Sequence, residues 1–203
     1  MKRPMTHIAM LLLAFTPWAQ AAQSPATPAK AHDLPRDCSE ISDSRVVNPS
    51  TSLHVALVSC PTGMHMVVDR KVDGASVETA SREFNIPYAT ANGVTALDKD
   101  TFQVNLLEVR YYANPSARAY RFHFQNNQWV LQELSFQATQ SCHGEAGLDA
   151  DAYDVDLLSG KVELTRYSGC DDFKKKQLTI EPVTISLEKF DPAEDRLAPF
   201  RYE

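Results

Sequence analysis

Alternating apolar and polar residues, repeated in several short runs, constrain the fold of this chain more than any other feature. In residues 119–134, AYRFHFQNNQWVLQEL, apolar side chains recur at every second position on both sides of Asn126 and Asn127. Period-two alternation is typical of half-buried strands, and asparagine tolerates the positive φ of a two-residue hairpin turn. The expected cross-strand pairs are Gln125 with Gln128, Phe124 with Trp129, Phe122 with Leu131, and Tyr120 with Glu133. We expect this aromatic stripe to belong to the core; the alternative is a binding platform for sugars or protein partners.

The same alternation predicts further strands along the chain. Residues 53–59 and 64–72 form a hairpin across the turn CPTG, 101–112 form a longer strand, and 177–190 form the last, with Pro182 confining its start to an edge or a bulge. Residues 76–84 show apolar positions at helical spacing and predict one short helix. The predicted class is mainly β: antiparallel hairpins forming a sandwich, barrel or open sheet, with at most one short helix.

Four aspartates lie in residues 147–161, GLDADAYDVDLLSGK, and raise the question of a calcium site. An EF-hand loop counted from Asp149 would need an oxygen ligand at its fifth position, glycine at its sixth and glutamate at its twelfth, but Tyr153, Asp154 and Gly160 stand there. A two-residue turn at 159–160 explains the segment better. The expected apolar pairs are Leu157 with Val162 and Val155 with Leu164, which leave Asp154 and Asp156 on the solvent face, with Asp156 opposite Glu163. A calcium site of another type stays open as the alternative.

The N-terminal segment has the features of an export signal. Lys2 and Arg3 precede the apolar run 8–15, and Ala19 and Ala21 have the spacing that signal peptidase requires. The apolar run would span only about 12 Å as a helix, short of the roughly 30 Å hydrocarbon core of a bilayer. We therefore expect cleavage after residue 21.

The expected organisation after the signal is a flexible linker at 22–37, a single β domain at 38–190 and a charged tail at 191–203. Removal of the signal takes away two basic residues and leaves 18 Lys plus Arg against 26 Asp plus Glu, a net charge of −8. Such an acidic chain is a poor nucleic-acid binder and suits a basic protein partner.

All four cysteines lie in the expected mature chain, as in proteins of oxidising compartments. Of the three connectivities, Cys38 with Cys60 and Cys142 with Cys170 close the shortest loops, worth about 3–4 kcal/mol each by chain entropy. A zinc site is the weaker alternative, because there is no C-x-x-C pair and the histidines are scattered. The neighbouring segment 171–176, DDFKKK, reads as a solvated charged turn whose lysines could contact an acidic group.

No catalytic motif is present in the sequence. A nucleophile elbow, H-E-x-x-H, a P-loop and G-x-G-x-x-G are all missing. The most reactive-looking cluster is SCHGE at 141–145, where His143 and Glu145 flank a turn near Ser141, although neighbours on an extended chain point to opposite faces. We expect a non-enzymatic protein; an enzyme using His123, His143 and scattered carboxylates is the remaining alternative.

The segments YRFHFQNNQWVL and DVDLLSGKVEL, about twenty residues apart, resemble the C-terminal part of small exported bacterial β-proteins, some of them toxin immunity proteins or hydrolase inhibitors and some without an assigned role. The resemblance covers about 50 of the 203 residues. It implies a secreted, mostly β, non-enzymatic binder and carries over no functional residue.

These features together predict a periplasmic or secreted binding protein without a cofactor or a membrane span, which acts on another exported protein. Inhibition or neutralisation of a toxic or cell-wall-directed enzyme is one such action. The expected contact is the acidic loop around the second cysteine pair, with His143, Glu145, Asp149 and Asp151 as its partner-binding residues. The alternative is a calcium- or carbohydrate-binding envelope module that uses the aspartates or the aromatic stripe.

Overall fold

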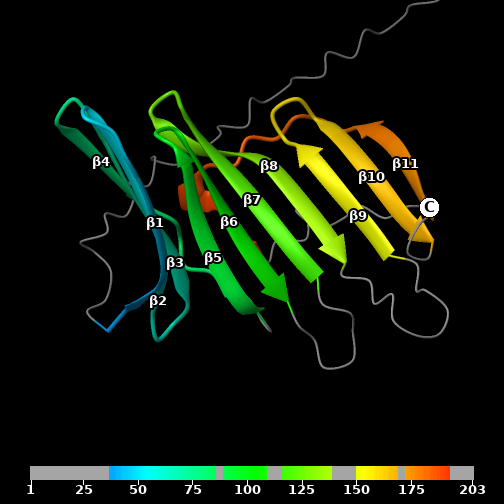
Figure 1. Cartoon of the computed structure of the whole chain (residues 1–203), viewed down its shortest axis with the longest axis horizontal. Coiled ribbons are helices and arrows are strands. Elements are labelled where there is room, and N and C mark those ends of the chain that lie inside the picture. The colour runs from blue at the N-terminus through cyan, green and yellow to red at the C-terminus, as the bar shows by residue number, and fades with distance from the viewer. Residues whose placement is uncertain (1–36, 86–88, 109–115, 139–149, 169–171, 193–203) are drawn as a thin grey trace, which may run out of the picture.

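Two antiparallel sheets make up the chain in the computed structural model, which describes residues 37–85, 89–108, 116–138, 150–168 and 172–192 (Figure 1). The first sheet has the order β1 (Ser39–Val47), β2 (Thr51–Ser59), β3 (Met64–Val72) and β4 (Ala75–Ala80). The second runs from β5 (Ala89–Asp98) through β6 (Thr101–Glu108), β7 (Ser116–Gln125), β8 (Gln128–Ala138), β9 (Ala150–Asp156) and β10 (Lys161–Ser168) to β11 (Asp172–Thr179). Within each sheet, strands that follow one another in sequence are neighbours in space. The mainly β class is therefore confirmed.

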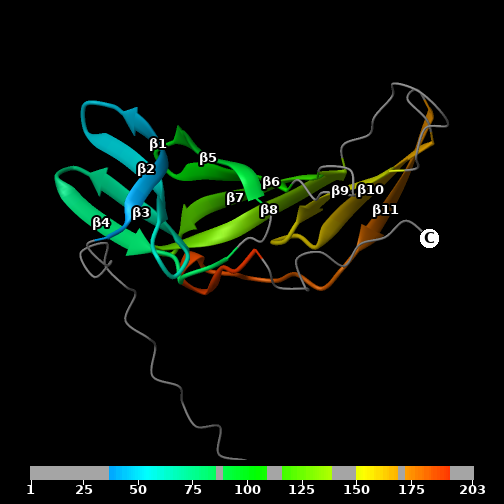
Figure 2. The ribbon, with the colours of Figure 1, turned by 90° about the horizontal axis from the view of Figure 1, so that it is seen from below.

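The two sheets meet along β1 and β5, seen edge-on in Figure 2. The hydroxyl of Ser42 accepts a hydrogen bond from the backbone N–H of Val94 at 3.2 Å, and that of Ser44 accepts one from Ala96 at 3.0 Å. These side chains satisfy backbone donors at the edge of β5, where no backbone ladder joins the sheets. The serines of β1 thus hold the two sheets together at their shared edge.

A second link between the sheets is made by Arg70 on β3. Its guanidinium donates to the carboxylate of Asp100, in the turn between β5 and β6, at 2.6 Å, and lies 4.2 Å from the ring centroid of Phe124. An arginine held by a carboxylate and stacked on an aromatic face has a fixed orientation. This contact therefore fixes β3 against the hairpin ends of the second sheet.

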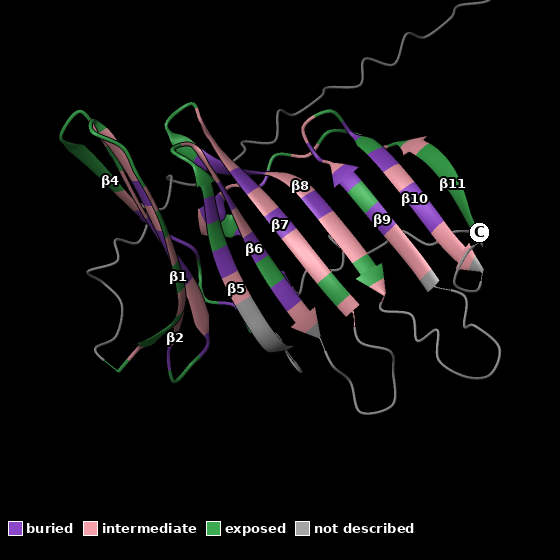
Figure 3. Cartoon of the chain, in the orientation of Figure 1, coloured by how far each residue is buried: buried purple, intermediate pink, exposed green. Residues whose placement is uncertain are grey.

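The buried core lies on one face of the seven-stranded sheet and is completed by the first sheet and the C-terminal segment. Its largest fully buried side chains include Tyr120, Phe122, Trp129, Leu131 and Leu187. Phe190 is also fully buried and contacts the rings of Phe84, Tyr120 and Phe122 edge-on at 4.9–6.0 Å. Burial alternates along the strands, as Figure 3 shows for β9. The expectation that the aromatic stripe is core is confirmed.

The hairpin of β7 and β8 has the predicted register except at its far end. Asn126 and Asn127 have φ of 51° and 62°, and Phe122 pairs with Leu131 as expected. Tyr120 pairs with Leu134 and not with Glu133, because a bulge at Gln132 inserts one residue into β8. The bulged Gln132 carbonyl accepts a hydrogen bond from the N–H of Leu157 at 2.9 Å, so the bulge is stabilised by the β9 end.

The short helix predicted at 76–84 is wrong, because this segment contains strand β4. Asp73 and Gly74 have φ of 48° and 87°, which makes them a two-residue hairpin turn that pairs Val72 with Ala75. Asp-Gly is a strong hairpin signal, and the β-branched residues Val77 and Thr79 favour a strand. The turn and the cross-strand pairing with β3 outweigh the helical spacing of the apolar residues.

The reading of the last segments also needs correction. DDFKKK is not a turn, because residues 172–176 belong to β11. The predicted strand at 177–190 ends at Thr179. Ile185 and Leu187 are buried as the alternation predicts, but the segment joins β8 through an isolated bridge between Val130 and Ser186 and not through a continuous ladder. It then forms the 3₁₀ turn η2 (Leu187–Lys189). Pro182 lacks the N–H that a continued ladder requires.

The predicted disulfide between Cys38 and Cys60 is present and ties the start of β1 to the end of β2. Cys142 and Cys170 lie outside the described residues. Nowhere in the described ranges is there a helix with the length and apolar character needed to cross a membrane.

Candidate functional site

The hairpin of β9 and β10 carries the aspartates that the sequence singled out. The predicted two-residue turn is wrong: Asp156 pairs with Lys161 and Val155 with Val162, so four residues, 157–160, connect the strands. The register therefore shifts by two residues, which preserves the predicted faces. Asp154 and Asp156 lie on the face away from the core, as expected, and Asp154 rather than Asp156 is opposite Glu163.

Asp156 explains why the four-residue turn is preferred. Its carboxylate accepts hydrogen bonds from the N–H groups of Leu158 and Ser159 at 3.0 and 3.1 Å and from the Ser159 hydroxyl at 2.6 Å. These hydrogen bonds lower the pKa of Asp156 below its ordinary value, the Ser159 hydroxyl contributing most. Gly160 closes the turn with φ of 72°. The Asp156 carboxylate therefore accepts three hydrogen bonds within the turn and stabilises it.

The expected partner-binding residues are only partly described. Asp151 lies on β9 and is paired with Arg166 on β10, with Nε at 3.0 Å from the carboxylate. His143, Glu145 and Asp149 lie outside the described residues. Among the residues that the structure describes, no group of three or more His, Cys, Asp or Glu side chains is arranged to hold a metal ion. Asp151, Asp154 and Asp156 have separate surroundings and form no common ligand set.

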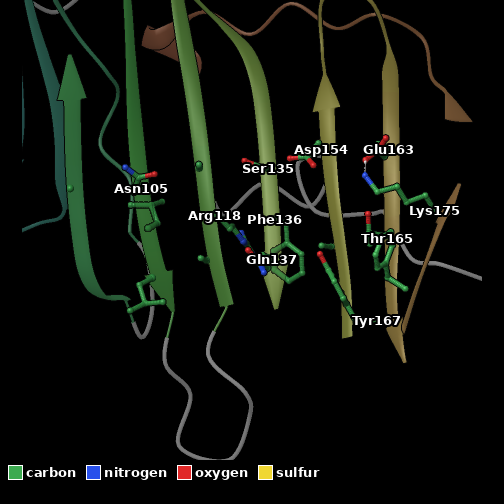
Figure 4. Close-up of a pocket in the computed structure, with 17 residues that line it drawn as sticks. Asn105, Arg118, Ser135, Phe136, Gln137, Asp154, Glu163, Thr165, Tyr167 and Lys175 are labelled. Carbon is green, nitrogen blue, oxygen red and sulfur yellow. Dashed lines mark hydrogen bonds and ion pairs between the residues drawn. The ribbon is translucent and has the colours of Figure 1, made fainter. Parts of the chain in front are cut away.

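A hollow lies on the face of the seven-stranded sheet away from the core, and we call it the outer groove. Its volume is about 840 Å³. On β5 to β8, which form its floor, it is lined by small residues such as Ala119 and Ser135, by larger ones such as Leu107 and Phe136, and by one charged residue, Arg118. One row of directly opposed residues crosses six strands: Gly93, Asn105, Ala119, Ser135, Asp154 and Glu163. The next row toward the ends of β6 and β8 contains Leu107, Ala117, Gln137, Ala152, Thr165 and Lys175. Figure 4 shows how the labelled side chains lie across the groove.

Larger side chains on β10 and β11 form one wall of the outer groove. Tyr167 pairs with Phe173, and their ring centroids lie 6.3 Å apart. Phe173 is 58% exposed, the second-highest value among the large apolar side chains that the structure exposes. An exposed aromatic pair beside amide and hydroxyl groups provides apolar contact area together with hydrogen-bonding partners.

Two carboxylates and a lysine lie where the floor meets this wall, and Arg118 on β7 adds a second positive charge to the groove. Asp154 and Glu163 are directly opposed carboxylates, and Lys175 on β11 forms an ion pair with Glu163, drawn as a dashed line in Figure 4. Asp154 makes no hydrogen bond or ion pair within the described residues. Desolvation against the sheet surface raises the pKa of Asp154, Glu163 raises it further, and Lys175 partly opposes them. The hydrogen bond to Glu163 raises the pKa of Lys175.

The described histidines lie away from the outer groove. His54 is 3.7 Å from Asp43, His65 is 3.3 Å from the Ser81 carbonyl, and His123 is 3.2 Å from the Thr101 hydroxyl. None of the three lines the groove. The groove therefore presents hydroxyl, amide, carboxylate, guanidinium, ammonium and aromatic groups.

Fold and site together define a two-sheet antiparallel β protein with an open polar groove on one sheet face. No protein-family model matches the chain, and neither the curated proteins nor the solved structures contain a match. The class therefore comes from this structure alone.

Sequence reasoning did not find the outer groove. Its floor combines residues from four strands, and no chemical motif links them in the sequence. One signal was present: Ala117, Ala119, Ser135 and Ala152 occupy outward positions where long polar residues are common. The aligned register is needed to turn these separate positions into one surface.

Proposed function

We propose that this chain is an exported, non-enzymatic binding protein whose outer groove receives a segment of another exported protein. The observation that carries the proposal is the outer groove itself, a hollow across the sheet that combines small, polar and aromatic side chains with charged groups from β7, β9, β10 and β11. A groove built on a hydrogen-bonded sheet is preformed, and a preformed surface lowers the entropic cost of binding.

The proposal places the protein in the periplasm or outside the cell. The N-terminal signal features and the Cys38–Cys60 disulfide support this location, since disulfides persist in oxidising compartments. Inhibition or neutralisation of a toxic or cell-wall-directed enzyme is the proposed consequence of binding. The resemblance of two hairpin segments to immunity proteins and inhibitors is its support.

Asp154 gives the proposed partner a charge preference. An ionised carboxylate that faces a second carboxylate and lacks an ion pair among the described residues would be stabilised by a basic side chain of the bound segment. The net negative charge of the chain favours the approach of a basic partner as well.

Affinity capture from an envelope extract tests the proposal with two matched variants. Ala119→Trp places a large ring on the groove floor, whereas Thr95→Trp places the same ring on the same sheet face outside the groove. We expect one specific partner to be retained by the wild type and by Thr95→Trp and lost with Ala119→Trp at moderate salt. Circular dichroism confirms that both variants are folded. Failure to retain a specific protein, or equal retention by both variants, contradicts the proposal.

A glycan is the second candidate ligand, favoured by the pair Tyr167 and Phe173 beside the hydroxyl and amide groups of the floor. Calorimetry with cell-wall sugars separates glycan binding from protein binding. The same measurement with calcium tests the metal-binding alternative. A heat of binding and a thermal shift with a sugar, both lost in Phe173→Ala, would establish glycan binding. No response to the sugars or to calcium would rule out the glycan- or calcium-binding alternative.

A further inference from the structure

Strand β11 forms the outer edge of the seven-stranded sheet and borders the outer groove. Among the described strands it pairs only with β10, and residues 173–177 are all exposed. Its eight residues extend over about 27 Å. An edge strand presents backbone donors and acceptors that can pair with another chain. β11 therefore has the backbone requirements for strand addition.

The three lysines of β11 divide between the two faces of the strand. Lys175 lies on the groove side and pairs with Glu163. Lys174 and Lys176 lie on the opposite face, across from Arg166 and Leu164, and neither makes an ion pair within the described residues. The nearby guanidinium of Arg166 is already held by Asp151. One face of the edge therefore carries two cations at alternate positions without a described counter-charge.

This charge pattern determines what can pair with the edge. Antiparallel pairing of two copies centred on residue 175 would place Lys174 opposite Lys176 of the other copy, and like charges directly opposite are destabilising. A segment with acidic residues at alternate positions would instead place one carboxylate opposite Lys174 and one opposite Lys176. We propose that β11 receives an extended acidic segment of a partner protein by strand addition. The proposal rests on the binding function above and adds a second contact to it.

A capped eight-residue peptide with glutamate at alternate positions, and threonine or valine between them, is the probe. Fluorescence anisotropy of the labelled peptide measures binding, and hydrogen exchange of the β11 amides locates it. We expect saturable binding with slower exchange in residues 172–179, and weakening at high salt. Two control peptides separate the contributions: one has lysine in place of glutamate, and the other keeps glutamate but contains two prolines that prevent backbone pairing. Neither is expected to bind.

The double variant Lys174→Glu with Lys176→Glu should weaken binding of the acidic peptide about tenfold or more, since two attractive cross-strand pairs become repulsive. Lys71→Glu is the matched control, an exposed strand lysine of the first sheet, and should leave affinity unchanged. Equal binding of the proline peptide or of the double variant overturns the proposal, as does the absence of binding by the acidic peptide.

The groove variant separates failure of this proposal from failure of the proposed function. Ala119→Trp should leave the peptide affinity of the edge unchanged, because residue 119 lies on β7, four strands away from β11. If partner capture depends on residue 119 while the acidic peptide does not bind, the groove function stands and strand addition is refuted. If the peptide binds the edge while no partner is captured, the edge is confirmed as an acidic-strand site and the groove function fails.

Discussion

Replacement of Gly160 by alanine tests the turn that sets the register of β9 and β10. A Cβ added at this position would lie 2.2 Å from the carbonyl oxygen of Ile180 and 3.2 Å from its carbon, both backbone atoms. The backbone N–H of Ile180 also donates to the Gly160 carbonyl at 2.8 Å, so the crossing chain cannot withdraw without losing this hydrogen bond. The clash therefore has no inexpensive relief.

The expected cost of Gly160→Ala combines three contributions. The φ of 72° costs an L-residue about 1–2 kcal/mol, loss of one backbone hydrogen bond costs about 0.5–1.5 kcal/mol, and displacement of the segment around Ile180 and Pro182 adds to both. We expect a free energy of unfolding lower by about 2–4 kcal/mol, which corresponds to a Tm lower by about 5–15 °C for a domain of this size.

Gly74→Ala is the matched control for this prediction. Gly74 has a similar φ of 87°, but an added Cβ would meet no atom within 4 Å. It should lose only the conformational contribution of about 1–2 kcal/mol. Thermal unfolding followed by circular dichroism, together with urea titration, gives both values. Equal destabilisation by the two substitutions would refute the packing of the 180–182 segment over the turn.

Three further predictions concern the core, the disulfide and the pH dependence of stability. Phe190→Ala should lower the free energy of unfolding by about 3–5 kcal/mol in urea titration because it opens a cavity among three rings, whereas Phe173→Ala should change it little; similar losses would contradict the docking of the C-terminal segment. Replacing Cys38 and Cys60 by serine should cost about 3 kcal/mol from the 22-residue loop, and an unchanged Tm would show that the bridge adds nothing. Asp154 has a folded-state pKa above its ordinary 3.8, so its ionisation opposes folding as the pH rises above that value. Asp154→Asn should therefore raise the Tm at pH 7 and leave it unchanged at pH 3, and a lower Tm at pH 7 would contradict the raised pKa.

Local chemistry explains which elements the sequence predicted well. The hairpins at 53–72 and 119–134 were found because alternation and turn residues act over a few positions along one chain. Two of the errors concern the register of paired strands. A bulge at Gln132 moved Tyr120 from Glu133 to Leu134, and the hydrogen bonds of Asp156 shifted the β9–β10 register by two residues. Neither effect is visible in hydrophobic periodicity.

The candidate site shows the same limit more strongly. Asp154 and Asp156 were correctly placed on the solvent face, because a shift of two residues preserves the face of every side chain. The outer groove was not predicted, since each of its floor residues is ordinary alone and becomes part of a surface only when Ala119, Ser135 and Asp154 are aligned across strands. The lysines of β11 were noticed in the sequence, but as a turn.

The amino-acid sequence by itself determined the β class, the Cys38–Cys60 pair and the faces of the strands, because alternation and turn chemistry are encoded within a few consecutive residues. Only the tertiary structure decided the strand order, the serine-bridged junction of the two sheets and the outer groove. These features depend on the register of successive strands and on contacts between the two sheets, which are fixed by bulges, turn hydrogen bonds and the packing of both sheets on one core.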